Sequence, residues 1–108
     1  MKQLKLATNY NNKLGCTIFS HIDKAPPSGV PESNLPIPFE IVTADGSYPP
    51  TQYKLVSFIR GTLKEFYSDI FTMPSHGMCR EDYQKWYLQK NPGTGLFTPM
   101  AVYFYALI

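Results

Sequence analysis

The sequence has few charges, few cysteines and no long apolar run, and each shortage excludes a class of protein. Only 17% of its 108 residues are charged, and the formal net charge of +2 is too weak to establish a polyanion-binding surface alone. No stretch approaches the roughly 20 apolar residues of a membrane helix, and the start of the chain lacks the apolar core of a secretory signal. We therefore expect a cytoplasmic protein without membrane contact, in which Cys16 and Cys79 are free thiols.

Motifs of the common enzyme and metal sites are also missing. No phosphate loop, dinucleotide fingerprint, G-x-S-x-G turn or H-E-x-x-H helix is present, which favours binding over catalysis and predicts no cofactor. Cys16, His21, His76 and Cys79 are ligand types found in structural zinc sites. Positions 16 and 21, however, would point to opposite faces of a strand, and His76 with Cys79 supplies only two ligands. No metal site is expected.

The remaining composition is that of one globular domain over residues 1–108. Hydrophobic residues make up 44% of the chain, enough to bury a single core. Seven of the ten prolines lie between Pro26 and Pro50, so the first half should consist of extended segments and turns. Strands are predicted over residues 16–22, 37–43 and 53–59, with a long proline-rich loop over 25–36.

Helices are predicted in the second half. Thr62 and Glu65 match a capping box, so a helix is expected from Thr62 until residues 72–77. Its apolar stripe consists of Leu63, Phe66, Tyr67 and Ile70. A second helix is expected over residues 80–90, with acidic residues in its first turn and Asn-Pro-Gly after its last. The apolar run 100–108 is predicted to be a strand inside the sheet.

Tyr83, Trp86 and Tyr87 fall at i, i+3 and i+4 of the second predicted helix. This spacing is typical of a helix packed on a sheet, so we interpret the stripe as core. The alternative interpretation is a platform on which nucleic-acid bases stack.

The order of these elements indicates an α+β fold with a small, curved, mostly antiparallel sheet and two helices before the final strand. The strand pair "PFEIVTADG…YKLVSFIRGTLKEF", the helix "GMCREDYQKWYLQKNP" and the closing "AVYFYALI" resemble the ASCH type of the PUA-like domains over about residues 37–108. The resemblance implies a small β-barrel with a cleft for a nucleic acid or nucleoside. The G-x-K-x-x-x-x-R signature of that family is absent from this chain, so no catalytic role is transferred to any residue.

The first functional hypothesis is a module that binds RNA, single-stranded DNA or a modified nucleotide in a cleft between strand 16–22 and the first helix. Interleaved basic and aromatic residues suggest its surface, with Tyr10 as a further exposed candidate. The candidate binding residues are Lys13, His21, Lys24, Tyr48, Tyr53, Lys54 and Arg60.

Two other functions remain open from the sequence. One is a small nucleoside-directed hydrolase in which His21 acts as a base with Lys54 or Glu40 nearby; it is implied only by hydrolases in the resembling family. The other is a protein-interaction module of a phage or mobile element, in which the stiff proline-rich loop 25–38 contacts a protein partner.

Overall fold

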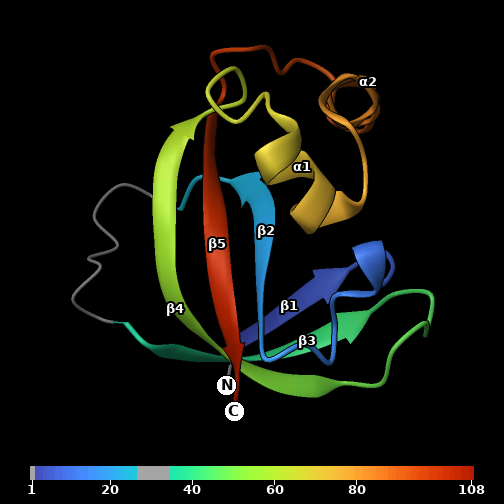
Figure 1. Ribbon diagram of the computed structural model, residues 1–108, viewed down its shortest axis with the longest axis vertical. Coiled ribbons are helices and arrows are strands. Elements are labelled where there is room, and N and C mark those ends of the chain that lie inside the picture. Colours follow the sequence, from blue (N-terminus) through green and yellow to red (C-terminus); the bar gives the residue numbers. More distant parts are fainter. Residues whose placement is uncertain (1, 27–34) are drawn as a thin grey trace.

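The computed structural model describes residues 2–26 and 35–108, which form a curved sheet with two helices gathered at one end (Figure 1). The strands are β1 (Lys2–Leu6), β2 (Ile18–Lys24), β3 (Ile37–Thr43), β4 (Thr51–Thr62) and β5 (Pro99–Leu107), and the helices are the 3-10 turn η1 (Tyr10–Asn12), α1 (Asp69–His76) and α2 (Arg80–Lys90). The α+β class and the two helices before the final strand are confirmed. In this described part, no helix has the length and apolar character needed to cross a membrane.

The sheet is mixed and has the strand order β1-β3-β4-β5-β2. β1 runs parallel to β3, and every other neighbouring pair is antiparallel. β5 lies between β4 and β2, so the prediction of a terminal strand inside the sheet is confirmed. A register shift between Leu55 and Ser57 marks a bulge in β4, and bulges bend a strand.

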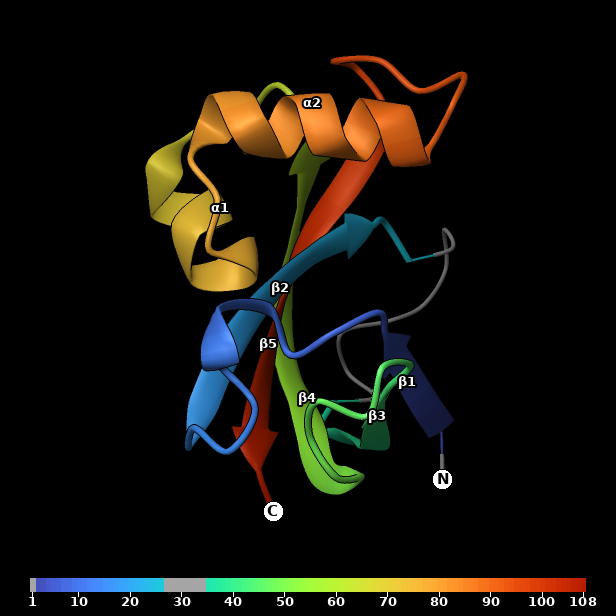
Figure 2. The ribbon, with the colours of Figure 1, turned by 90° about the vertical axis from the view of Figure 1, so that its right-hand side faces the viewer.

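β1 and β2 are the two edges of this curved sheet. Among residues 2–26 and 35–108 they do not pair with each other, so the sheet is open and the closed barrel remains a prediction. Figure 2 shows α2 crossing the end of the sheet, with α1 and η1 beside β2. One edge of the sheet is therefore covered by helical chain instead of by another strand.

Apolar side chains pack on both faces of the sheet. One cluster contains Leu6, Leu14, Phe19, Ile41, Tyr53, Leu55, Phe58 and Tyr105. The other, which includes side chains of α2, contains Ile22, Leu63, Phe66, Tyr83, Tyr87, Met100 and Val102. Successive side chains of a strand point to opposite faces, which is why β5 supplies both clusters.

The predicted bounds are right for β3 and α2, and wrong for the first helix. Residues 63–66 form a turn, and α1 begins only at Asp69. The Thr62 and Glu65 pair does form its hydrogen bond, from the Glu65 N–H to Thr62 Oγ1 at 3.2 Å. It closes a turn at the end of β4, however, because Leu63 and Phe66 are already buried against the sheet in this conformation.

Three further differences concern strands. β2 begins at Ile18, so Cys16 lies before it and is exposed. β4 extends beyond both ends of the predicted segment 53–59. β1 was not predicted at all, because its five residues carry two lysines and only Leu6 is buried.

Candidate functional site

Most of the buried polar side chains of the described residues gather beside the free edge of β2. Lys13, His21, Ser75 and His76 are each 6% exposed or less. Lysine in particular is almost never fully buried without partners. This cluster is therefore the first candidate for a functional site.

The turn that precedes β2 directs Lys13 inward. Asn11 and Asn12 adopt positive φ angles of 56° and 50°, which asparagine tolerates better than most residues. The Asn9 side chain accepts a hydrogen bond from the Leu14 N–H at 2.9 Å and so fixes the return of the chain. These local features place the long Lys13 side chain between β2 and α1.

The Lys13 amine lies within hydrogen-bond distance of two carbonyl oxygens and one imidazole nitrogen. Lys13 Nζ lies 3.0 Å from the Ser20 carbonyl oxygen, 2.7 Å from the Ser75 carbonyl oxygen and 2.8 Å from His21 Nδ1. The ring of Phe19 is a further neighbour, with its centroid 5.1 Å from Nζ. The cluster thus connects η1, β2 and α1 through one amine.

Ser75 connects α1 to β2 and fixes the state of His76. The Ile22 N–H donates to Ser75 Oγ at 2.7 Å, and Ser75 Oγ lies 2.6 Å from His76 Nδ1. All three groups are satisfied when the hydroxyl accepts from Ile22 and donates to Nδ1, which assigns the proton of His76 to Nε2. α1 is held in place for this role by its N-cap Ser68 and by Gly77, whose φ of 70° ends the helix.

Burial shifts every titratable group of the cluster toward its neutral form. Burial lowers the pKa of Lys13 to about 7, against a smaller opposing effect of the Asp23 carboxylate. Burial, followed by the Lys13 charge, lowers the pKa of His76 to about 3. The same two causes, with a contribution from His76, hold the pKa of His21 well below its usual value. Perturbed groups of this kind are concentrated at functional sites.

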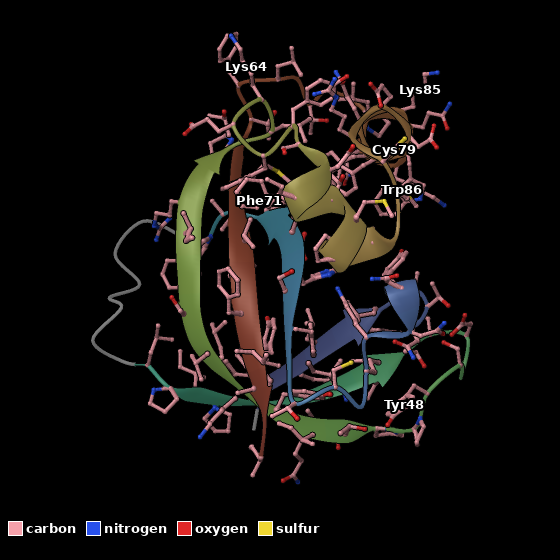
Figure 3. The ribbon with its side chains drawn as sticks, viewed as in Figure 1. Tyr48, Lys64, Phe71, Cys79, Lys85 and Trp86 are labelled. Atoms are coloured by element: carbon pink, nitrogen blue, oxygen red, sulfur yellow. The ribbon has the colours of Figure 1, made fainter. Side chains whose placement is uncertain are left out.

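A cavity of about 160 Å³ opens next to this cluster; we call it the edge pocket. Its walls come from the end of β1, η1, β2, α1 and α2. They consist of Lys5, Leu6, Ala7, Tyr10, His21, Ile22, Asp23, His76, Tyr83, Trp86, Tyr87 and Asn91. Figure 3 shows Trp86 on α2 beside α1. The pocket therefore lies where the helices meet the two edges of the sheet.

Aromatic rings dominate the lining of the edge pocket. The His76 ring has four aromatic neighbours, with centroids 4.5 Å away for Tyr10, 4.9 Å for His21 and Tyr83, and 5.1 Å for Trp86. His21 and His76 are stacked, with an angle of 24° between their planes. Such walls suit a flat ligand that stacks on rings.

Two tyrosines that line the edge pocket carry buried hydroxyls without a hydrogen-bond partner among the described residues. Tyr83 is 1% exposed and Tyr87 is 4% exposed, and both hydroxyl oxygens are unpartnered. Burial raises the pKa of both phenols, so they are protonated donors. A buried polar group left unpaired costs about 1 to 3 kcal/mol, and native structures contain few of them.

A second, larger cavity of about 320 Å³ shares two residues with the edge pocket. It is mainly apolar, with Ile37, Phe39, Leu55 and Phe58 among its lining residues. His21 and Asp23 line both cavities. His21 Nε2 lies 4.0 Å from Asp23 Oδ2, whose side chain is 48% exposed. His21 and Asp23 thus border both an aromatic cavity with some polar groups and a mainly apolar one.

Of the seven predicted binding residues, the structure brings together only Lys13 and His21. Lys24 and Lys54 are exposed, and neither lines one of these two cavities of the described residues. Arg60 donates to the Pro26 carbonyl oxygen at 2.8 Å. Lys54 and Glu40, which were proposed to assist His21 as a base, line neither cavity. Glu40 instead accepts a hydrogen bond from Gln3 at 3.0 Å.

The two tyrosines of the predicted set belong to another part of the molecule. Tyr53 was expected to be exposed, and this is wrong: it is 0% exposed. Its hydroxyl accepts from the Gly15 N–H at 2.7 Å and donates to the Cys16 carbonyl oxygen at 3.0 Å. Tyr48 lies far from Trp86 in Figure 3. Most of the loop 25–38, namely residues 27–34, falls outside the described residues.

Sequence reasoning did not count the lining residues His76, Tyr83, Trp86 and Tyr87 among the binding residues; a base-stacking role of the three α2 residues was only its alternative interpretation. The helical spacing of the tyrosines correctly predicted burial, and the same two residues also line the pocket. No three histidine, cysteine or carboxylate side chains of the described segments are grouped as metal ligands. Comparison of the chain with protein-family models, with curated proteins and with solved structures finds no match.

Proposed function

We propose that the edge pocket binds one flat, polar ring, such as the base of a nucleotide or of an unstacked residue in single-stranded RNA or DNA. The observation that carries this proposal is a pair of residues that line the pocket, Tyr83 and Tyr87, whose buried hydroxyls have no hydrogen-bond partner among the described residues. A ligand that accepts hydrogen bonds from Tyr83 and Tyr87 removes the cost of leaving them unpaired.

The size and the lining of the pocket support a single ring. A cavity of about 150 Å³ is known to hold one benzene molecule, and the edge pocket measures about 160 Å³. Stacking of a base on aromatic side chains contributes about 1 to 3 kcal/mol. Tyr10, His76 and Trp86 supply such faces, while Asp23 and Asn91 supply polar groups that an exocyclic amine or carbonyl of a base can contact.

The PUA-like resemblance belongs to the same proposal. The curved, mostly antiparallel sheet and the two helices before β5 support it. The hypothesis placed a nucleic-acid cleft between strand 16–22 and the first helix. The edge pocket is lined by β2 and α1, and also by α2, η1 and the end of β1. The resemblance is an analogy of fold, so the proposal depends on the pocket itself.

Trp86 provides a direct assay, because it is the only tryptophan of the chain and lines the pocket. Its fluorescence should change when free bases, nucleosides, nucleoside monophosphates and short single-stranded RNA or DNA are titrated in separate experiments. Tyr83→Phe and Tyr87→Phe should each weaken binding about 3- to 10-fold, the value of one hydrogen bond. Neither change should lower stability, because each removes an unpaired buried hydroxyl.

Tyr67→Phe is the matched control, since Tyr67 lines neither cavity. It should leave affinity unchanged. The proposal fails if none of these compounds binds below millimolar concentration at low salt. It also fails if the two pocket variants bind as tightly as the unmodified protein.

A second candidate function is a small nucleoside-directed hydrolase. It is favoured by the position of His21 between the two cavities, with Nδ1 held by Lys13. A histidine oriented through one nitrogen can exchange a proton through the other. Incubation with acylated and modified nucleosides, followed by chromatography, tests it: product must form, and His21→Ala must abolish its formation.

A further inference from the structure

The three polar atoms around Lys13 Nζ leave few ways to place the protons of the Lys13 and His21 pair. Two of these atoms are the carbonyl oxygens of Ser20 and Ser75, which only accept. The third neighbour, His21 Nδ1, donates in one neutral tautomer and accepts in the other. The state of the amine therefore decides the state of the ring.

When Lys13 is an ammonium, its three N–H groups match the three acceptors. His21 Nδ1 must then carry a lone pair, so the ring proton sits on Nε2. When Lys13 is a neutral amine, its two N–H groups go to the two carbonyls, and its lone pair accepts from an Nδ1–H. Nε2 then carries the lone pair. The two other combinations are disfavoured. An ammonium next to an Nδ1–H places donor against donor, and a neutral amine that keeps both N–H groups on the carbonyls places its lone pair against the lone pair of Nδ1.

We propose that Lys13 selects the tautomer of His21, and thereby decides whether the edge pocket offers a bound ring a hydrogen-bond donor or an acceptor. The inference rests on the proposed function for its ligand. When the pH rises, Lys13 Nζ passes a proton to His21 Nδ1, and His21 Nε2 releases its proton to solvent. The pair as a whole thus loses one proton. Lys13 lines neither cavity, so it is a positioning residue that acts through His21.

The groups around the pair set the pH at which the exchange occurs. Burial brings the pKa of Lys13 to about 7, so the ammonium form prevails below that pH and the amine above it. Asp23, on β2, favours the ammonium, because its carboxylate attracts the charge and faces the Nε2–H. Tyr10 of η1, His76 of α1 and Tyr103 of β5 also face His21. These three are neutral at pH 7, because their pKa values are shifted away from it.

The proton exchange predicts which hydrogen-bonding groups of a bound base the pocket prefers. Below about pH 7, the Nε2–H favours a carbonyl oxygen or an unprotonated ring nitrogen of a base. Above that pH, the Nε2 lone pair favours an amino group or a ring N–H. Affinity for two bases that present opposite edges should therefore change in opposite directions with pH.

Nuclear magnetic resonance of the free protein tests the exchange without any ligand. The chain has two histidines, so long-range proton–nitrogen correlation spectra of a nitrogen-15-labelled sample contain two imidazole patterns. Between about pH 5.5 and about pH 9, His21 should change from the Nε2–H to the Nδ1–H tautomer. His76 should keep its proton on Nε2 throughout and is the internal control.

Two further measurements separate Lys13 from other causes. The Lys13 Nζ resonance of the unmodified protein should titrate with the same midpoint as His21, and Lys13→Met should hold His21 in one tautomer over the whole range. Asp23→Asn should move the midpoint to lower pH, because a charge that favours the ammonium is lost. An unchanging His21 tautomer, or an exchange that persists in Lys13→Met, overturns the inference. If Lys13→Met does not fold, different midpoints for Lys13 and His21 overturn it equally. Absence of base binding with an intact exchange contradicts only the proposed function.

Discussion

The buried cluster predicts that the free energy of unfolding rises with pH from about 5 to about 9. Lys13 has a pKa of about 7 in the folded protein and its ordinary value of 10.5 when unfolded. Between these two values the unfolded chain binds more protons than the folded protein, so stability increases as the pH rises. Stability increases with pH because burial of the charged Lys13 costs free energy, and this cost disappears as the amine loses its proton.

The magnitude follows from the size of the shift. Each pH unit between the folded and unfolded pKa contributes up to about 1.4 kcal/mol per group. Because Lys13 is half titrated at the start of the interval, it should add about 2 kcal/mol between about pH 7 and about pH 9. His76, with pKa values of about 3 folded and 6.5 unfolded, should add about 1.5 kcal/mol between about pH 5 and about pH 6.5. The lowered pKa of His21 acts in the same direction.

Buried tyrosine side chains set the pH above which the free energy of unfolding stops rising. Burial raises the pKa of the Tyr83 and Tyr105 phenols above its ordinary value of 10.0. A group with a raised folded pKa stabilises the protein below its unfolded pKa and loses that contribution as the pH rises further. Stability should therefore reach a maximum between about pH 9 and about pH 10, above the usual range of about 5 to 8.

Urea unfolding at a series of pH values, followed by far-ultraviolet circular dichroism, measures this curve. The slope of free energy against urea must stay constant for the values to be compared. Lys13→Met should flatten the interval above about pH 7. The gain on the acid side should become smaller, because the charge that helps burial to lower the pKa of His76 and His21 is lost. A flat or falling free energy of unfolding between about pH 7 and about pH 9 in the unmodified protein would refute the burial argument.

Three other changes test the packing around the site. A chain that ends at Pro99 lacks the rest of β5, which pairs with both β4 and β2. Each buried side chain that is lost contributes about 1.5 to 3 kcal/mol, and several together exceed a total stability of about 5 to 15 kcal/mol. Cooperative melting should therefore vanish. Gly15→Ala should cost about 1 to 3 kcal/mol in thermal unfolding, because Gly15 has a φ of 96° and a Cβ would lie 2.5 Å from Tyr48 Oη. Ser68→Ala should cost about 1 kcal/mol in urea unfolding, since Ser68 accepts from the Ile70 N–H as the N-cap of α1.

Local sequence patterns predicted the elements that are governed by local chemistry. The alternation of residues 37–43 gave β3 with correct bounds, and acidic residues at one end with Asn-Pro-Gly at the other gave α2. β1 was not predicted because this edge strand buries only Leu6, so its sequence shows no alternation of apolar and polar residues. The first helix was misplaced because the hydrogen bond between Thr62 and Glu65 forms equally well in a turn.

The site depends on contacts that no local pattern records. Lys13 and His21 were both among the predicted binding residues, but as members of an exposed basic and aromatic surface. Lys13 follows two asparagines in a polar stretch, and its burial results from contact with Ser75, far away in the sequence. The pairing of His21 with His76 across β2 and α1 is of the same kind. The sequence identified two residues of the site and not their environment.

The free edge of β2 explains part of this cluster and leaves another part unexplained. An edge strand presents unpaired carbonyl and N–H groups that must find partners when they are covered. Lys13 satisfies the Ser20 carbonyl and Ser75 satisfies the Ile22 N–H, so these two side chains have a structural reason to be buried there. That reason does not extend to the unpartnered hydroxyls of Tyr83 and Tyr87, two residues of α2 that line the pocket. Removing those hydroxyls leaves the cover of β2 intact, which is why Tyr83→Phe and Tyr87→Phe separate a binding site from a packing arrangement.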